Sequence, residues 1–489
     1  MNGLEDADLQ YFLSSYGLIL SSFPEKGRGL VSTRDFSPGD IIISQDPYVC
    51  APSTSCCDGC FSRGKLKMCT SCQMTQYCGS TCQKSQWKLH RLECQALIGL
   101  SEDRKKMLTP TVRLMARLLL KKKLQDDNTI PTTSDDNYDV LLALVSHMAD
   151  IDENKLVLYA QMANLVKLVL PLMEINIKEV IENFSKMACN AHTICDSELM
   201  PLGTGIYPVI SIINHSCLPN CVLVFEGRKA VLRAVKHITR GTEVSITYIE
   251  TALTTTERKK LLKEQYFFDC TCHCCNTPHT VFLKGALEDN QDIILNGYRC
   301  KAKPCHGVLH HDSANNIYRC KVCGSTREKH SIDQINSKIK LLSERASRCV
   351  SSKDYLEAKD LYKIVEHLQL KIYNPLSICL MKTQEDIMKI LIALNDWEGA
   401  LIYCRLTIPI YQRVYPAIHP LVGLQYYTCG KLEWLLRQAG EALQSYTKAI
   451  DILRITHGTT TPFMRELLLK IEEANADARL LQRKTALLQ

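Results

Sequence analysis

The chain has 489 residues, of which 46% are hydrophobic and 23% charged, and its mean hydropathy is −0.10. This length allows roughly three or four domains, and the composition excludes collagen-like chains, coiled-coil rods and wholly disordered chains. The net charge of +7 is mild for this size and does not by itself indicate a nucleic-acid or membrane partner.

The 25 cysteines are the most unusual feature of the composition. Residues 1–10 lack the basic and apolar regions of a signal peptide. Polar residues interrupt the most apolar stretch, 155–180, so we expect no membrane span. A cysteine-rich chain without an export signal is expected to keep its thiols reduced and to bind metal with them. Disulfides are the alternative interpretation.

In chain order, residues 17–49 are the first to show the pattern of strands, with β-rich runs on either side of a turn. The same order of strand, glycine-containing turn and strand recurs at 230–249. We therefore expect one β-fold that is interrupted by two insertions. The first insertion, 56–94, is dense in cysteine, and the second, 101–187, has apolar residues at helical spacing.

From about residue 331 to the end, the pattern is helical and repetitive. Ala358, Ala400 and Ala442 occupy equivalent positions in three similar segments, at a spacing of 42 residues. A small residue repeated at one period in helical sequence is typical of stacked helix pairs. A plain helical bundle is the alternative, because the period exceeds the usual length of such repeats.

Eight soft or borderline metal ligands lie in pairs within the first insertion. Ligands two or three residues apart can hold one face of an ion, so four pairs predict two tetrahedral zinc sites. Zinc binding would then supply the folding free energy of this short segment. Cys56 could replace Cys57, although only Cys57 keeps the two-residue spacing to Cys60. The predicted ligands are Cys57, Cys60, Cys69, Cys72, Cys78, Cys82, His90 and Cys94.

The motif Asn-His-Ser-Cys-Leu-Pro-Asn at residues 214–220 precedes Gly-Thr-Glu-Val-Ser-Ile-Thr-Tyr at 241–248. Cys270, Cys272 and Cys275 follow, and three cysteines cannot complete a zinc site. We expect Cys217 to be the fourth ligand, which would attach this cluster to the 214–220 motif.

A further group of cysteines has the spacing of a zinc ribbon. Free thiols are the alternative, and three histidines could compete as ligands. The predicted ligands are Cys300, Cys305, Cys320 and Cys323, and the competing histidines are His306, His310 and His311.

Taken together, these motifs resemble the SET- and MYND-domain (SMYD-type) protein lysine methyltransferases, and the length suits a plant-type member. The resemblance covers nearly the whole chain and implies an α+β multidomain fold, a β-rich SET core split by a MYND zinc finger and a helical insert. The implied segments are 12–52 (SET, N-terminal part), 53–96 (MYND finger), 97–188 (helical SET insert), 189–250 (SET core), 251–278 (post-SET), 279–328 (zinc ribbon) and 329–489 (all-α TPR-like domain).

In that family the ligand pairs of the finger interleave. Cys57, Cys60, Cys78 and Cys82 would hold one zinc, and Cys69, Cys72, His90 and Cys94 would hold the other. Such fingers usually dock proline-rich peptides. The basic residues of the finger could instead contact nucleic acid, although such a cluster is more often a solvated surface. They are Arg63, Lys65, Lys67, Lys84, Lys88 and Arg91.

The resemblance also implies S-adenosylmethionine as the methyl donor. Tyr248 would be the catalytic tyrosine, and Tyr266 the second tyrosine of the lysine channel. His147 could equally be an ordinary surface histidine. The implied cofactor-binding residues are Lys26, Gly27, Arg28, His147, Asn214, His215, Tyr248, Tyr266 and Phe268.

Two residues depart from the family pattern. Thr242 stands where the family usually has an acidic residue, although Glu243 is kept. His192 stands where relatives commonly have an aromatic residue beside the lysine channel, which leaves substrate choice and methylation state open. Neither departure removes a group that methyl transfer requires.

The sequence thus predicts an S-adenosylmethionine-dependent methyltransferase that acts on lysines of histone or non-histone proteins. We expect a monomer of the nucleus and/or cytoplasm, with four zinc ions and little or no direct nucleic-acid binding. The alternative is a zinc-rich adaptor with weak or no catalysis. A nucleic-acid-binding zinc protein is a third possibility, but the sequence lacks a concentrated basic stripe.

Overall fold

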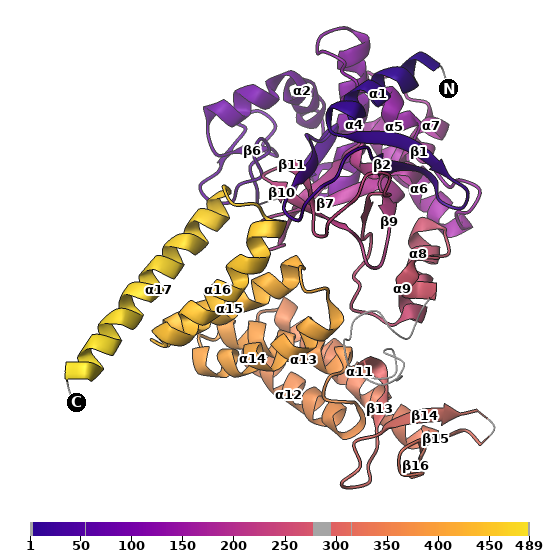
Figure 1. The fold of residues 1–489 in the computed structure, drawn as a ribbon. Coiled ribbons are helices and arrows are strands. Elements are labelled where there is room, and N and C mark those ends of the chain that lie inside the picture. Colours follow the sequence, from indigo (N-terminus) through magenta and orange to yellow (C-terminus); the bar gives the residue numbers. More distant parts are fainter. Residues whose placement is uncertain (1–2, 54, 277–294, 314, 488–489) are drawn as a thin grey trace. The chain divides into compact units, whose positions relative to one another are not determined.

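The computed structural model describes residues 3–53, 55–276, 295–313 and 315–487 (Figure 1). The chain divides into two compact units. The first contains Met1–Tyr248 and Leu262–Asp269, and the second contains Ile249–Leu261 and Cys270–Gln489. This division does not follow the seven predicted segments, whose boundaries stay predictions. Among the described helices, none is both long and apolar enough to cross a membrane.

Strands from before residue 53 pair with strands from after residue 190, which confirms the interrupted β-fold. A hairpin of two antiparallel strands turns at Gly27, whose φ is 71°. Two further antiparallel sheets have the orders β10-β11-β3 and β4-β8-β7. The strands are β1 (Leu18–Phe23), β2 (Gly27–Ser32), β3 (Ile41–Gln45), β4 (Val49–Pro52), β7 (Ala191–Cys195), β8 (Pro201–Ile206), β10 (Cys221–Glu226) and β11 (Lys229–Ala234).

Two motifs that are distant in sequence meet in a short parallel pair of strands. β9 (Asn214–His215) pairs with β12 (Ser245–Ile246), and Asn214 lies opposite Ser245. The buried core of this region includes Leu30, Ile213 and Ile246, so apolar contacts hold the two motifs together. α1 (Gly3–Ser15) and the 3-10 turn η1 (Ile210–Ile212) complete this part of the first unit.

The zinc finger and the helical insert share one hydrophobic core. Cys94 and Leu97 of the finger pack in the same buried cluster as Val112 and Met115 of the insert. The finger is therefore packed against the insert. Its elements are β5 (Lys67–Met68), β6 (Gln76–Tyr77) and α2 (Ser80–Ile98). The insert contains α3 (Glu102–Lys106), α4 (Pro110–Asp126), α5 (Tyr138–Leu142), α6 (Glu153–Val169) and α7 (Ile177–Asn190).

The second unit begins with short elements and ends in a helical domain. α8 (Thr255–Tyr266) takes the chain from the second unit back to the first, and α9 (His273–Asn276) follows in the second. A four-stranded antiparallel sheet then has its strands in chain order. These strands are β13 (Tyr298–Arg299), β14 (Val308–Asp312), β15 (Ile317–Cys320) and β16 (Thr326–Glu328).

The helical domain repeats in its geometry as well as its sequence. α12, α14 and α16 each have 18 residues and begin 42 residues apart. Ala358, Ala400 and Ala442 are 0% exposed, as expected where helices cross closely, and this confirms the predicted TPR-like repeat. The helices are α11 (Lys329–Ser351), α12 (Tyr355–Ile372), α13 (Ile378–Ala393), α14 (Trp397–Val414), α15 (Pro420–Leu435), α16 (Ala439–Thr456) and α17 (Pro462–Leu487).

Candidate functional site

The ligand pairs of the finger gather in two interleaved sets. Within each set, the ligand atoms all lie within 4.8 Å of one another. Zinc–sulfur bonds of about 2.3 Å in a tetrahedron place two sulfurs about 3.8 Å apart. The Sγ atoms of Cys60 and Cys78 are 3.7 Å apart, and those of Cys69 and Cys94 are 3.9 Å apart, so both sets fit zinc. Cys57, rather than Cys56, belongs to the first set.

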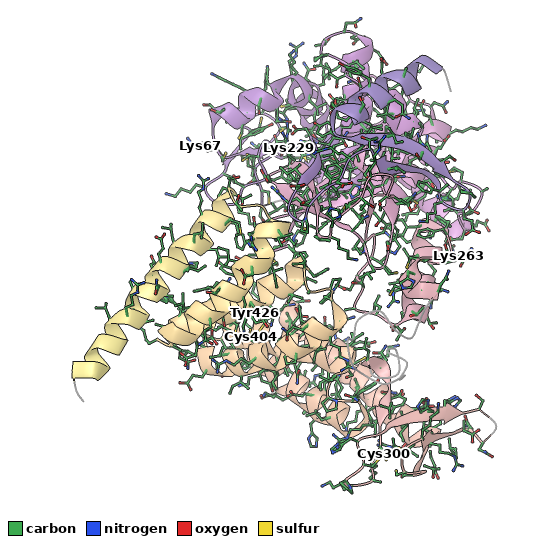
Figure 2. All side chains as sticks on the ribbon, in the orientation of Figure 1. Lys67, Lys229, Lys263, Cys300, Cys404 and Tyr426 are labelled. Carbon is green, nitrogen blue, oxygen red and sulfur yellow. The ribbon has the colours of Figure 1, made fainter. Side chains whose placement is uncertain are left out.

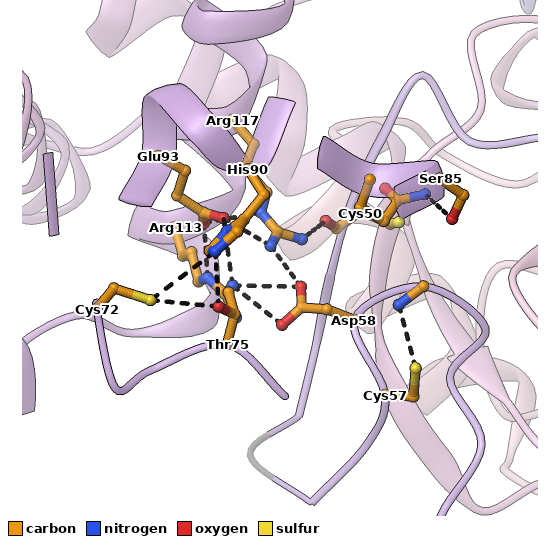
Figure 3. Close-up of polar contacts among 12 residues, drawn as sticks. Cys50, Cys57, Asp58, Cys72, Thr75, Ser85, His90, Glu93, Arg113 and Arg117 are labelled. Atoms are coloured by element: carbon orange, nitrogen blue, oxygen red, sulfur yellow. Dashed lines mark hydrogen bonds and ion pairs between the residues drawn. The ribbon is translucent and has the colours of Figure 1, made fainter. Parts of the chain in front are cut away.

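A buried network of charges surrounds His90 (Figure 3). The Nε2 atom of His90 lies 4.0 Å from the Cys72 thiol, and its Nδ1 atom lies 3.4 Å from Glu93. A carboxylate on the second ring nitrogen is the usual way in which a protein orients a zinc-binding histidine. Glu93 also accepts 2.8 Å hydrogen bonds from both Arg113 and Arg117.

Asp58 is the second carboxylate of this network, and it follows the ligand Cys57 directly in sequence. Arg113 and Arg117 of α4 both form ion pairs with Asp58, and Arg117 also donates to the carbonyl of Cys50 in β4. The two arginines therefore connect both zinc-ligand sets of the finger to the insert and to the SET sheet.

The ribbon cysteines form a further set, within the second unit, and Figure 2 labels one of them, Cys300. The Sγ atoms of Cys300 and Cys323 are 3.5 Å apart, and those of Cys305 and Cys320 are 3.7 Å apart. A Cβ atom on Gly307 would lie 2.6 Å from the Cys320 sulfur, so the turn requires glycine for this approach. The competing histidines, His306, His310 and His311, are not members of the set.

Cys217 is buried in the first unit, and Cys270, Cys272 and Cys275 lie at a point where the chain enters the second unit. Cys270 and Cys275 are buried and Cys272 is half-buried. The post-SET zinc site that would use these four thiols stays a prediction.

Two predicted cofactor residues, Lys26 and Asn214, contact the carboxylate of Glu243. The Lys26 ammonium is 2.6 Å from one carboxylate oxygen, and the Asn214 amide nitrogen donates to the other at 3.0 Å. Because a carboxylate only accepts hydrogen bonds, the amide nitrogen of Asn214 must face Glu243. The amide oxygen is consequently directed elsewhere. Arg28, on the other side of the turn, donates to the carbonyl of Ala143 at 2.6 Å.

The turn at residues 26–29 approaches Asn214 closely. A Cβ atom on Gly29 would lie 2.5 Å from the Asn214 amide nitrogen and 2.8 Å from the Phe23 ring. Glycine at this position therefore permits the close approach of backbone and amide. The cation, the amide oxygen and the glycine backbone provide donors and acceptors of the kind that an amino-acid zwitterion needs, so these residues fit the methionine part of S-adenosylmethionine.

His215 connects a predicted zinc ligand to the predicted catalytic tyrosine. Its Nδ1 atom accepts from the backbone N–H of Tyr248 at 3.0 Å, and its Nε2 atom lies 3.3 Å from the Cys217 sulfur. Both ring nitrogens therefore have protein partners. We infer that His215 positions Tyr248, and that its contact with cofactor would use the ring carbons or the backbone.

The two predicted tyrosines lie next to each other. Their ring centroids are 4.9 Å apart, and the Tyr266 hydroxyl donates to the backbone carbonyl of Tyr248 at 3.2 Å. The Tyr248 hydroxyl donates to the carbonyl of Ile213 at 2.6 Å. Burial raises the pKa of Tyr248 above its ordinary value and the pKa of Tyr266 to about 12. Both hydroxyls therefore keep their protons at neutral pH.

The other two predicted cofactor residues with rings, Phe268 and His147, make separate contacts. The Phe268 ring is 6.0 Å from His215 and 6.4 Å from Tyr248, so it belongs to the tyrosine cluster. His147 stacks instead on the neighbouring Phe267, with centroids 5.1 Å apart. His147 has a φ of 50° and lies in the loop after α5. It is therefore not a histidine on the surface of a helix.

His192 lies on β7 beside aromatic and polar side chains. Its ring meets Tyr207 edge-on at 5.8 Å, and its Nε2 atom is 3.5 Å from the Ser211 hydroxyl. Burial lowers the pKa of His192 to about 4, so the imidazole is neutral at physiological pH.

Comparison with known proteins identifies the family. A model of the SET domain matches residues 27–249. Histone-lysine N-methyltransferase ASHR1 of Arabidopsis thaliana is 51% identical to this chain over 479 residues, which are 96% of this chain and 98% of that protein. Histone-lysine N-methyltransferase SMYD3 of Mus musculus is 29% identical over 93% of this chain and 96% of that protein. The chain belongs to the SMYD-type lysine methyltransferases.

The similarity to SMYD-type proteins extends well beyond the SET model. N-lysine methyltransferase SMYD2 of Mus musculus is 28% identical over 91% of this chain and 96% of that protein. These spans include the finger and the C-terminal helices, so the family predicted from the motifs is confirmed, in its plant-type form.

Sequence reasoning missed several side chains that support the SMYD-type site. Phe267, which was not among the predicted residues, contacts His147, and Glu93 orients His90. A signal for Glu93 was present, because it lies three residues after a predicted ligand and can share its helix face. Arg113 and Arg117 are four residues apart in a stretch of α4, 112–120, that is otherwise apolar, and this spacing also indicates one shared buried partner.

Proposed function

We propose that this chain transfers methyl groups from S-adenosylmethionine to lysine side chains of proteins, including histones. The observation that carries the proposal is the cluster of Tyr248, Tyr266, Phe268 and His215, together with Asn214, which directly precedes His215 in β9. This cluster provides protonated hydroxyls and aromatic rings, and the Asn214 amide is suited to the amino-acid zwitterion of S-adenosylmethionine. Membership of the SMYD-type family supports the same activity.

S-adenosylmethionine, when bound, supplies a sulfonium methyl group that a neutral amine displaces in line. Free lysine has a pKa of about 10.4, so the site must favour the deprotonated amine. Tyr248 and Tyr266 cannot take that proton, since their hydroxyls are already protonated, and we infer that the proton leaves to solvent. Burial of the amine among aromatic rings favours its neutral form, and the hydroxyls orient it.

We propose four zinc ions, two in the finger, one in the ribbon and one held by Cys217, Cys270, Cys272 and Cys275. Each set has four protein ligands and therefore no open position for a reactive water, so these ions are structural. The finger ions would maintain the core shared with the insert.

We also propose that the protein acts as a monomer in the nucleus and/or cytoplasm, and that the finger docks proline-rich peptides. Trp87 is 47% exposed and Met68 is 51% exposed on the finger, and such side chains suit a proline-rich segment.

The proposed activity is tested by incubating lysates with labelled S-adenosylmethionine and the zinc-loaded chain, and by identifying methylated lysines by mass spectrometry. We expect labelled lysines with the parent and a large reduction with Tyr248→Phe. Tyr11→Phe is the matched control, because Tyr11 is 81% exposed in α1. Absence of S-adenosylmethionine binding in calorimetry of the folded parent would favour the adaptor alternative.

A further inference from the structure

The zinc-ribbon segment, residues 295–328, contains 6 basic and 2 acidic residues. Strand register places these charges on a defined face. Leu309 in β14 and Cys320 in β15 are paired, buried, and packed with Ile332 of α11. They mark the inner face of the sheet. Successive residues of a strand alternate between faces, so the residues next to them, His310 and Arg319, lie on the outer face.

The outer face is basic at the end near the zinc ligands. Arg299 is paired with Val308. Val308 directly precedes the inward-facing Leu309, so Val308 and its partner Arg299 lie on the outer face, as Arg319 does. Lys321 directly follows the last residue of β15. Arg299, Arg319 and Lys321 are all exposed, and so are Lys301 and Lys303 in the turn between Cys300 and Cys305. Five cations therefore surround this end of the sheet.

The carboxylates of the described residues leave these cations without an ion pair. Within the part of the chain that the structure describes, none of the five forms an ion pair. The two acidic residues of this segment, Asp312 and Glu328, are both paired with Ile317 across the sheet. By the same alternation they lie on the outer face, but at the end away from the zinc ligands, so only the other end of that face is basic. Burial lowers the pKa of Arg327, and the charge of Arg299 lowers it further, which indicates that like charges repel in this sheet.

We propose that the outer face of the ribbon sheet binds the phosphodiester backbone of a nucleic acid. Unpaired cations on a rigid sheet lower stability, and a polyanion would compensate for them. The middle row of this face is His310, Arg319 and Thr326, which are polar side chains. A protein interface usually has apolar or aromatic residues at its centre, whereas phosphate contacts need only cations and hydrogen-bond donors. This binding is separate from methyl transfer and does not depend on it.

The test measures binding of the full, zinc-loaded chain to fluorescent 20-base-pair duplexes by anisotropy, between 50 and 200 mM salt. The variant is Arg299→Gln/Arg319→Gln/Lys321→Gln. We expect the parent to bind with strong salt dependence, because each phosphate contact contributes about 0.9 to the slope of log affinity against log salt. Loss of three contacts should reduce that slope by about 2 to 3 and weaken binding at 50 mM salt by at least about tenfold.

The matched control is Lys448→Gln/Arg454→Gln/Arg465→Gln. These residues are also exposed in the second unit, and both triple variants change the net charge from +7 to +4. Equal weakening by the control, an unchanged slope in the ribbon variant, or absence of binding at 50 mM salt would each overturn the proposal. Duplex DNA and duplex RNA are measured separately, to show which of the two nucleic acids supplies the phosphodiester backbone. If the chain binds poly-glutamate but neither duplex, the nucleic-acid proposal is wrong and the partner of this face is an acidic protein.

Discussion

Glu243 is a positioning residue at the proposed cofactor site. Its carboxylate contacts Lys26 with one oxygen and Asn214 with the other, although Glu243 is 217 residues from Lys26 in sequence. Its side chain is 20% exposed and that of Lys26 is 38% exposed, so solvent screens the ion pair only in part. The orientation of the Asn214 amide depends on this single acceptor.

Glu243→Gln should weaken S-adenosylmethionine binding about 3- to 10-fold, because the amide can still accept from Asn214 but no longer pairs with Lys26. Calorimetry measures the dissociation constant, and steady-state kinetics should show a raised KM with little change in kcat. Glu102→Gln is the control, since Glu102 also pairs with a lysine, on the exposed helix α3. A lower kcat with unchanged affinity would contradict the positioning role.

His192 should make the folded state sensitive to mild acid. Its pKa is about 4 in the folded chain and about 6.5 when unfolded, so the unfolded state binds a proton that the folded state does not. Stability therefore falls as pH falls below about 6.5. Between pH 7 and 5.5 we expect the parent to lose about 1 kcal/mol more stability than His192→Phe does; the variant keeps the loss due to His419, whose pKa burial also lowers to about 4. Urea unfolding at both pH values measures the difference.

His237→Phe is the control for this measurement, because His237 is exposed. The control should keep the acid-dependent loss of the parent. If His192→Phe loses as much stability as the parent between pH 7 and 5.5, the imidazole is not held neutral by burial.

At the residue scale, the sequence predicts best those site residues whose partners are only a few positions away in the chain. The ligand pairs of the finger and the ribbon were predicted from spacings of two to four intervening residues. Tyr248 was assigned from the resemblance of its motif to the family, and its catalytic role stays a proposal. The roles of Glu243 and His215 could not be predicted in the same way. They depend on contacts of Glu243 with Lys26 and of His215 with Tyr248, which are distant in sequence, and no local pattern encodes such contacts.

At the scale of elements, α4 is attached to the finger by charges in a dry interface. Arg117 is 4% exposed and Glu93 is 3% exposed, so both charges depend on each other for compensation. Such a pair adds little net stability compared with an apolar contact, but removal of one partner is costly. The insert and the finger are thereby required to fold together.

Glu93→Gln should destabilise the chain by about 3–5 kcal/mol, because Arg113 and Arg117 keep their charges in a buried site. It should also release zinc from the Cys69, Cys72, His90 and Cys94 set about 10-fold faster or more. Denaturant unfolding and zinc transfer to a coloured chelator measure the two effects. Glu102→Gln serves again as an exposed control, and equal zinc release in both variants would contradict a role for Glu93 in orienting His90.

The helical repeat shows what sequence could and could not predict about elements. The spacing of Ala358, Ala400 and Ala442 predicted the repeat because a closely packed crossing selects a small residue. The structure adds a feature that the amino-acid sequence does not indicate. Lys353, Asn395 and Arg437 all have left-handed φ values, of 62°, 58° and 62°, at the same 42-residue spacing. Three different side chains adopt one turn, so packing of the helices determines this conformation.

At the scale of the whole molecule, the ribbon and the SET core belong to different compact units. Cys305→Ser removes one ligand of the ribbon set, which lies wholly in the second unit. We expect metal analysis to fall from about four zinc ions per chain to about three, while S-adenosylmethionine affinity stays within about twofold of the parent.

Cys195→Ser is the control, because Cys195 is half-buried in β7 and is not a member of any of the four sets. It should keep the zinc content of the parent. Zinc content unchanged by Cys305→Ser would show that the ribbon thiols do not hold an ion.

The interrupted β-fold has a consequence for synthesis on the ribosome. β3 ends at Gln45, and its partner β11 begins at Lys229. At a translation rate of about 5–20 residues per second, the edge of β3 waits for roughly 10 to 40 seconds before it can pair. The finger and the insert emerge during that delay and share a core of their own. Zinc supply during translation would therefore determine whether the finger and the insert are already folded when β11 emerges, whereas the translation rate sets how long the edge of β3 is unpaired.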